Sequence, residues 1–168
     1  MTLGTLAGTM PASGTPVFTA TVNGVPIPQG SKRIGRNRRT GKPILVEDNP
    51  ETAPWRNHVT EVAGMIARNI RLPEPLDGPL RVRLTFTMPK PASAPKRRRT
   101  WPHTKPDVDK LTRAVHDALT DAGVWREDSR VQHVSAEKVY PGEPAHHGEA
   151  LDRPGVQITV WRVEDVAP

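Results

Sequence analysis

The sequence predicts a single α/β domain, in which a small mixed β-sheet of about four strands packs with two main helices. Two observations support this fold class. Short segments of β-branched or alternating apolar residues are separated by two longer segments whose apolar residues recur at helical spacing. The chain has 168 residues, of which 35% are hydrophobic, and this is enough for one core. Strands that alternate with helices are typical of layered α/β folds.

The domain is expected to cover residues 16–164, between a disordered N-terminal tail at 1–15 and a C-terminal tail at 165–168. The N-terminal tail is rich in Thr, Gly, Ala and Ser, and it lacks the basic start and apolar stretch of a secretory signal. The chain contains no cysteine and no apolar run of about 18 residues. These features predict a soluble, cytoplasmic protein with no membrane partner, no disulfide and no thiolate metal site.

The first strand is expected over residues 17–22, where the sequence VFTATV is rich in β-branched residues. It ends at Asn23-Gly24, which is a strong turn signal. The next stretch, 25–42, is rich in Gly, Pro and Arg, and it predicts a mobile basic loop.

The first helix is expected to end near Asn69. Its N-cap stays open among three residues, which are Asp48, Asn49 and Thr52. A second strand follows over 80–88, where apolar residues alternate with Arg and Thr, so that the two kinds point to opposite faces. A loop rich in Pro and Arg, 89–106, connects this strand to the second helix.

The second helix is expected to begin at Asp107 and to end before Gly123, which suits the C′ position. Two further strands are expected over 130–140 and 156–163. Between them, residues 141–154 carry several Pro and Gly, so we expect an exposed loop.

The charges are distributed unevenly along the chain, which carries a net charge of +6. Residues 1–46 and 78–106 contain no acidic side chain, and six carboxylates then occur between residues 107 and 128. A single basic run is more often a solvated surface, but two acid-free basic blocks favour a nucleic-acid partner. The residues expected to contact DNA are Lys32, Arg33, Arg36, Arg38, Arg39, Lys96, Arg97, Arg98, Arg99 and Lys105.

The acidic segment can be explained structurally or chemically. An Asp at a helix N-terminus commonly caps free N–H groups, and for Asp107 and Asp109 alone this is the more frequent role. However, Asp109, Arg113, His116 and Thr120 fall within about 60° of one another on the predicted helix, on the side away from its apolar stripe. Asp128 follows a sharp return of the chain and could lie near them.

Clustered carboxylates of this kind suit phosphodiester hydrolysis. Mg²⁺ prefers hard oxygen ligands, and a bound ion activates water and stabilises charge on the reacting oxygens. A nearby cation can stabilise the phosphate in the transition state. We therefore expect Asp107 and Asp109, together with an acid of the pair Glu127-Asp128, to bind Mg²⁺, or Mn²⁺ as a substitute, without an organic cofactor. Arg113 is the candidate cation and Lys110 is the alternative, although Arg113 could instead form an ion pair with Asp109 or Asp117.

Several strings in this segment together resemble the RusA family of Holliday junction resolvases. They are PDVDKL at 106–111, RA at 113–114, DALT at 117–120, AGVW at 122–125 and EDS at 127–129. The resemblance extends more weakly over about residues 17–163. It implies a homodimer from a bacterial or phage-infected cell, with a mixed α/β fold and Mg²⁺-dependent symmetrical nicking of four-way DNA junctions.

By this resemblance, the family's metal-binding acids match Asp107, Asp109 and Asp128, and its essential lysine matches Arg113. The chain departs from the family pattern at three further positions, where Lys110 replaces Asn, Glu127 replaces Asp and Arg130 replaces Gln. An arginine keeps the charge of a lysine but presents a planar fork of donors.

Two other function classes stay open at this point, a non-enzymatic nucleic-acid binder and a metal-dependent nuclease with broader branched or flap substrates. Asp117 could support the site or pair with Arg113, and the supporting role is the favoured one. Trp101 and Trp125 could stack on splayed bases, although core packing is the commoner use of tryptophan.

Overall fold

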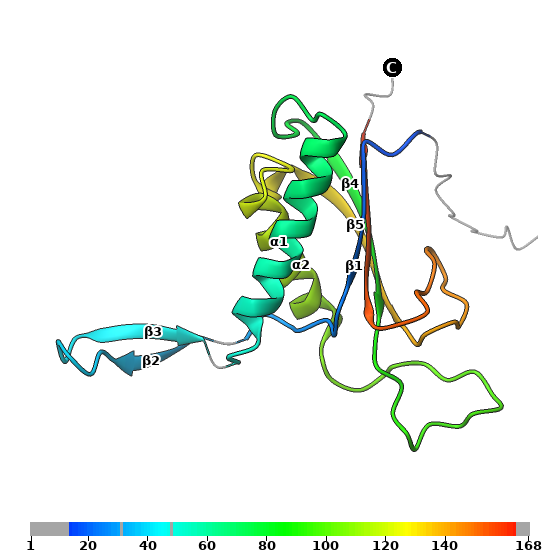
Figure 1. Cartoon of the computed structure of the whole chain (residues 1–168), viewed down its shortest axis with the longest axis horizontal. Coiled ribbons are helices and arrows are strands. Elements are labelled where there is room, and N and C mark those ends of the chain that lie inside the picture. The colour runs from blue at the N-terminus through cyan, green and yellow to red at the C-terminus, as the bar shows by residue number, and fades with distance from the viewer. Residues whose placement is uncertain (1–13, 31, 48, 164–168) are drawn as a thin grey trace, which may run out of the picture.

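The computed structural model describes residues 14–30, 32–47 and 49–163. The expected tails, 1–15 and 165–168, lie outside the described residues apart from Gly14 and Thr15. Within the described ranges, six strands, two α-helices and one short 3₁₀ helix follow one another, and Figure 1 shows their arrangement. Their bounds are β1 Phe18–Asn23, β2 Lys32–Arg36, β3 Pro43–Glu47, α1 Thr52–Asn69, β4 Leu80–Thr87, α2 Val108–Asp121, η1 Asp128–Arg130, β5 Val131–Val139 and β6 Gly155–Arg162.

The main sheet has four strands in the order β1-β6-β4-β5. The β1–β6 and β4–β6 pairs are antiparallel, whereas β4 and β5 are parallel. A parallel pair needs a long crossover connection, and α2 provides it here. The predicted mixed sheet with two main helices is confirmed. No end of its four strands differs from the predicted position by more than one residue.

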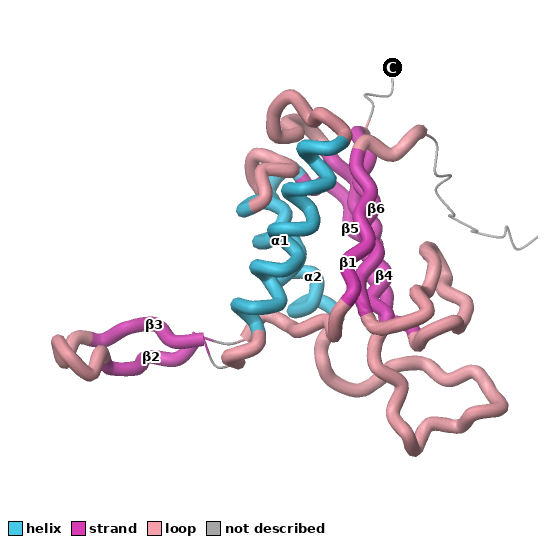
Figure 2. The backbone as a smooth tube through the Cα atoms, viewed as in Figure 1, coloured by secondary structure: helices cyan, strands magenta, loops and turns pink. Residues whose placement is uncertain are grey.

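The predicted basic loop over 25–42 is wrong in part. Residues of β2 pair with those of β3 as an antiparallel hairpin, with Ile34 opposite Leu45 and Gly35 opposite Ile44. Gly35 and Pro43 interrupt the apolar alternation of these short strands, and the sequence therefore looks like a loop. In Figure 2 the hairpin extends away from the rest of the molecule.

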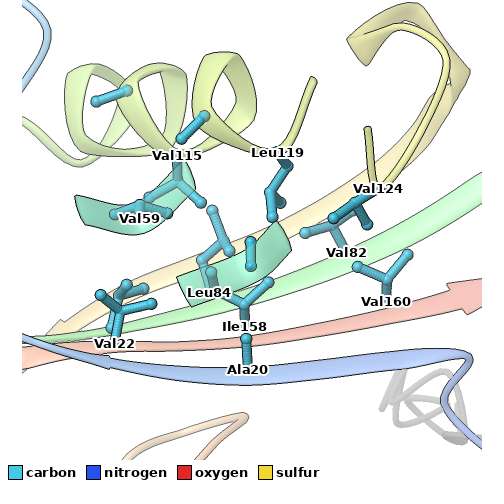
Figure 3. Close-up of a cluster of buried hydrophobic side chains, with 14 of the residues drawn as sticks. Ala20, Val22, Val59, Val82, Leu84, Val115, Leu119, Val124, Ile158 and Val160 are labelled. Carbon is cyan, nitrogen blue, oxygen red and sulfur yellow. The ribbon is translucent and has the colours of Figure 1, made fainter. Parts of the chain in front are cut away.

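Both helices cover the same face of the main sheet, and the core lies between the helices and this face (Figures 1 and 3). The buried side chains come from alternate positions of the strands and from one stripe of each helix. The residues drawn at its centre include Val22, Val59, Leu84, Val115, Leu119 and Ile158. The strands therefore serve as a rigid support on which α2 is held in a fixed position.

The opposite face of β4 is also covered, which the alternating sequence does not predict. Thr85 and Thr87 are completely buried there. The backbone N–H of Leu151 donates to Oγ1 of Thr87 at 2.9 Å, so the segment between β5 and β6 packs on this face. A Cβ at Gly148 would lie 2.0 Å from Oγ1 of Thr85, and a glycine is therefore required at this close approach.

The N-terminus of α1 uses none of the predicted caps in the expected way. Glu51 is the N-cap residue, and its side chain makes no capping hydrogen bond. Asn49 accepts the N–H of Glu51 at 3.0 Å, while the hydroxyl of Thr52 donates to the carbonyl of Pro28 at 3.0 Å. Asp48 lies outside the described residues. The start of α1 is thus tied to the segment that precedes the hairpin.

Neither helix is long and apolar enough to cross a membrane, a finding that covers the described residues.

Candidate active site

The N-terminus of α2 carries the first two candidate carboxylates. Asp107 is the N-cap residue by its backbone, but its side chain makes no capping hydrogen bond. Its carboxylate Oδ2 lies instead 3.7 Å from Nζ of Lys110, and the side chains of both residues are about half exposed. Asp109 stands in the first turn and is exposed. The Asp107 carboxylate is therefore not consumed by the capping role that would explain it structurally.

A hollow of about 450 Å³ lies beside this end of α2. Three parts of the chain line it, namely α2, the start of η1, and β5. Its lining residues are Val108, Asp109, Thr112, Arg113, His116, Asp128, Val134 and Ala136. Asp128 thus shares one hollow with Asp109 and Arg113, although 19 positions separate it from Asp109 in the sequence.

The return of the chain after α2 places Asp128 in this hollow. Gly123 has a positive φ of 69°, a conformation that costs glycine little, and it ends the helix. Trp125 is then buried, and its indole N–H donates to Oγ1 of Thr120 at 2.7 Å. Leu76 also pairs with Trp125 through an isolated β-bridge. The core role of Trp125 therefore fixes the path of the chain just ahead of Asp128, and this residue does not stack on bases.

His116 lies between the hollow and the core. Its ring meets Trp125 edge-on with centroids 5.3 Å apart, and its buried Nε2 has no hydrogen-bond partner among the described residues. Burial lowers the pKa of His116, while the charges of Asp128 and Asp117 act in the opposite direction. Burial is the larger of these effects, so the surroundings favour the uncharged imidazole. The sequence places His116 on the polar stripe of α2 but does not indicate this burial.

A second cavity of about 550 Å³ lies on the other side of the α2 N-terminus. Most of its lining is proline and other apolar side chains, but Asp107, Lys105, Lys110 and Lys138 also contribute. The structure thus divides the three predicted metal ligands. Asp109 and Asp128 share one hollow, and Asp107 faces the adjoining cavity.

Among the described residues, no three His, Asp or Glu side chains form a ready-made metal site. Two aspartates nevertheless converge on the smaller hollow, and neither makes a hydrogen bond or ion pair with another side chain of the described chain. Asp107 stands only two residues before Asp109 at the same end of the helix, but its side chain lines the adjoining cavity.

Lys138 is a site residue that the sequence analysis missed. Its ammonium group donates to the carbonyls of Thr104 at 2.7 Å and Pro106 at 2.8 Å, directly before Asp107. Burial lowers the pKa of Lys138, and the charge of Asp107 opposes this effect. The sequence shows only one lysine in an alternating strand. The parallel pairing of β5 with β4 brings Lys138 to the loop that precedes Asp107, and this pairing cannot be read from that pattern.

The two candidate cations differ in their surroundings. Lys110 forms its ion pair with Asp107, whereas the exposed Arg113 takes part in none of the ion pairs found in the described residues. The alternative role for Arg113, an ion pair with Asp109 or Asp117, is therefore not found among the described residues. Asp117 instead lies 3.8 Å from Arg56 of α1, and it connects the two helices rather than supporting the hollow.

The predicted DNA-binding residues lie on two protruding segments (Figure 1). One is the β2–β3 hairpin, which carries Lys32, Arg33 and Arg36 in β2, and Arg38 and Arg39 in its turn; the side chains of Lys32 and Arg33 lie outside the described set. The other is the connection between β4 and α2, where Lys96, Arg97, Arg98, Arg99 and Lys105 are all exposed.

Trp101 is the exposed aromatic residue of the second segment, with 39% of its surface accessible. Its ring stacks on His146 with centroids 4.7 Å apart, and the guanidinium of Arg99 lies 3.6 Å from the ring centroid. Lys90 and Glu143 form an ion pair at 2.5 Å nearby. The loop between β4 and α2 is therefore joined by specific contacts to the loop between β5 and β6.

Two comparisons relate the chain to known proteins. A profile of the family described as Endodeoxyribonuclease RusA matches residues 23–147, a range that includes α2, η1 and β5. The chain is also similar to a protein of Bacillus subtilis (strain 168) described as "Uncharacterized protein YqaN". The two are 30% identical over 131 residues, which cover 74% of this chain and 88% of the relative.

Proposed function

The chain belongs to the RusA endodeoxyribonuclease family, and from this premise we propose that it is a Mg²⁺-dependent endonuclease that cuts four-way DNA junctions. The proposed reaction is paired, symmetrical hydrolysis of phosphodiester bonds. The observation that carries this proposal is that Asp109, Arg113 and Asp128 line one hollow. The carboxylate of Asp107, which makes no capping hydrogen bond, lies at the same end of α2.

The residues at the hollow fit Mg²⁺. Carboxylate oxygens are hard ligands, and Mg²⁺ usually takes one or two of them together with waters and substrate phosphate. Asp109 and Asp128 supply two such groups with no competing side-chain partner in the described chain, and Asp107 is the proposed third ligand. When bound, the ion supplies an activated water and offsets charge on the phosphate. Mn²⁺ is expected to substitute because it accepts the same oxygen ligands.

Arg113 is the proposed catalytic cation. Its guanidinium can donate two parallel hydrogen bonds to phosphate oxygens and lower the cost of charge that develops there. Lys110 is the weaker candidate because it pairs with Asp107 and lines the adjoining cavity. His116 also lines the hollow, between Arg113 and the buried Trp125, and it is proposed to shape the site rather than to act in catalysis.

The substrate is proposed to be held mainly through its phosphates. The exposed cations of residues 96–99 and Lys105 lie in the chain segment that leads into Asp107. Such contacts position a duplex without reading its sequence. Paired cuts on two opposed strands need two active sites, so we propose that the protein acts as a homodimer, in the cytoplasm of a bacterial or phage-infected cell.

A nicking assay on a labelled four-way junction, with and without Mg²⁺ and beside a linear duplex, tests this proposal. We expect Mg²⁺-dependent nicking of the junction alone. Asp109→Asn should abolish nicking and retain binding, whereas Asp117→Asn, the same change on the same helix, should nick at nearly the parent rate. Junction binding without nicking under any divalent ion would contradict the enzyme, and equal cleavage of the linear duplex would contradict the junction preference.

A further inference from the structure

The β2–β3 hairpin is a separate two-stranded sheet that extends from the molecule (Figures 1 and 2). Its strands pair over five positions, and its turn is closed by hydrogen bonds from Asn37 N to Lys42 O at 2.9 Å and from Gly41 N to Asn37 O at 2.8 Å. A two-stranded hairpin on its own is marginally stable in water. This well-formed hairpin therefore suits a role in which a partner covers it.

The middle of the hairpin exposes large apolar side chains. Ile34 and Leu45 pair directly across the strands, and 79% and 68% of their surfaces are accessible. Opposed residues of an antiparallel pair lie on one face, so these two form a joint apolar contact. Ile44, opposite Gly35 on the other face, is 41% exposed.

The positive charge of the hairpin indicates the kind of partner that it binds. Arg36, Arg38, Arg39 and Lys42 lie at its turn end, and all four are exposed. No acidic residue occurs before Glu47, which closes the base of β3. A concentration of cations without acids attracts a polyanion, whereas it would repel the same region of a second copy of the chain.

The segment just ahead of the hairpin contacts both helices of the body. In the segment that leads into β2, the N–H of Gln29 donates to the carbonyl of Lys110 in α2 at 3.0 Å. On the same segment, the carbonyl of Pro28 accepts the hydroxyl of Thr52 in α1. The hairpin therefore leaves the body beside the first turn of α2. In Figure 1 it extends to the opposite side of the molecule from the other basic segment, the loop between β4 and α2.

We propose that the hairpin is a DNA-binding arm that enters the major groove of a second duplex of the branched substrate. A major groove about 12 Å wide admits a two-stranded β-ribbon. The turn cations then contact the flanking phosphates, and the Ile34–Leu45 face packs on base edges, where thymine methyl groups offer apolar contact. The arm and the catalytic body thus grip two duplexes at once, which gives the junction preference. This inference rests on the proposed function.

The test compares Ile34→Ser/Leu45→Ser with the parent in binding to a four-way junction and to a linear duplex, by fluorescence anisotropy. Met65→Ser is the matched control because Met65 is a 49% exposed apolar residue on α1. We expect the double variant to lose about tenfold in junction affinity, with little change on the linear duplex. Arg38→Ala/Arg39→Ala should weaken junction binding and lower its salt dependence.

An unchanged junction affinity in both arm variants, with a parent that still nicks junctions, would overturn the arm and leave the proposed function intact. Sedimentation of the same samples covers the alternative partner. If Ile34→Ser/Leu45→Ser converts a dimeric parent into monomers, the apolar face is a contact between copies and the DNA assignment is wrong. A parent that neither binds nor nicks junctions would overturn both proposals.

Discussion

Replacing Lys138 with methionine removes the amine that holds the chain just before Asp107. Methionine keeps much of the aliphatic stem, so the change acts mainly on the two hydrogen bonds to the carbonyls of Thr104 and Pro106, at 2.7 and 2.8 Å. A hydrogen bond from a charged donor contributes about 1.5–3 kcal/mol when it is well buried. Lys138 is only partly buried and the Thr104 bond is exposed. We therefore expect a total loss of about 1.5–3 kcal/mol for the pair of bonds.

Equilibrium urea unfolding measures that loss, and a Mg²⁺ titration of the nicking rate measures its effect on the site. Lys138→Met should raise the Mg²⁺ concentration at half-maximal rate several-fold, because the chain that carries Asp107 is less well held. Lys96→Met is the control, since Lys96 is an exposed lysine of the same basic segment. A Lys138→Met protein with parent stability and the parent response to Mg²⁺ would refute the positioning role.

Three further perturbations follow from the same structure. Gly148→Ala should destabilise the fold by about 1–3 kcal/mol, because its Cβ would lie 2.0 Å from Oγ1 of the buried Thr85; thermal unfolding at parent stability would contradict this close approach. The hydrogen bond from Lys90 lowers the pKa of Glu143 below its ordinary value of 4.5, so this carboxylate stabilises the joined loops above that pH and the contribution is lost as the pH falls through the lowered pKa. The stability difference between the parent and Glu143→Gln should thus shrink from pH 6 toward acid, as followed by urea unfolding, and a constant difference would count against the ion pair. Replacing Arg97, Arg98 and Arg99 with alanine should reduce the slope of log affinity against log salt by about two to three, and an unchanged slope would remove these residues from the DNA contact.

The fold could be predicted where local sequence patterns coincide with burial. Leu80, Val82, Leu84 and Phe86 alternate strictly and are all completely buried. In α2, the apolar stripe that includes Leu111, Val115 and Leu119 faces the core as the helical spacing indicates. In these elements the buried positions are the ones that the apolar periodicity indicates, so tertiary contacts do not change the predicted secondary structure.

The rest of the fold depends on contacts between distant segments. Thr85 and Thr87 lie on the face of β4 that carries the Arg and Thr side chains, yet the segment before β6 covers them. The β2–β3 hairpin was hidden by Gly35 and Pro43, two residues that are rare inside strands. In both cases the composition of a segment is typical of a loop, and only its partners in space decide its structure.

The candidate site shows the same division. The placement of Asp109 and Arg113 on one face of α2 follows from helical spacing alone, and the hollow confirms that they share a surface with His116. The arrival of Asp128 depends on the turn at Gly123 and the burial of Trp125, which spacing does not specify. Lys138 depends in addition on the parallel register of β5 with β4.

The claim at the centre of the proposed mechanism is that Asp128 joins Asp109 in binding one divalent ion. Mn²⁺ binding, followed by electron paramagnetic resonance in the parent, Asp128→Asn and Glu127→Gln, tests it most directly. Glu127 is the adjacent exposed acid, and its carboxylate accepts a hydrogen bond from Ser129 at 3.0 Å. We predict that Asp128→Asn weakens Mn²⁺ binding by about tenfold or more, while Glu127→Gln binds as the parent does. Equal Mn²⁺ affinity in all three proteins would contradict the shared site.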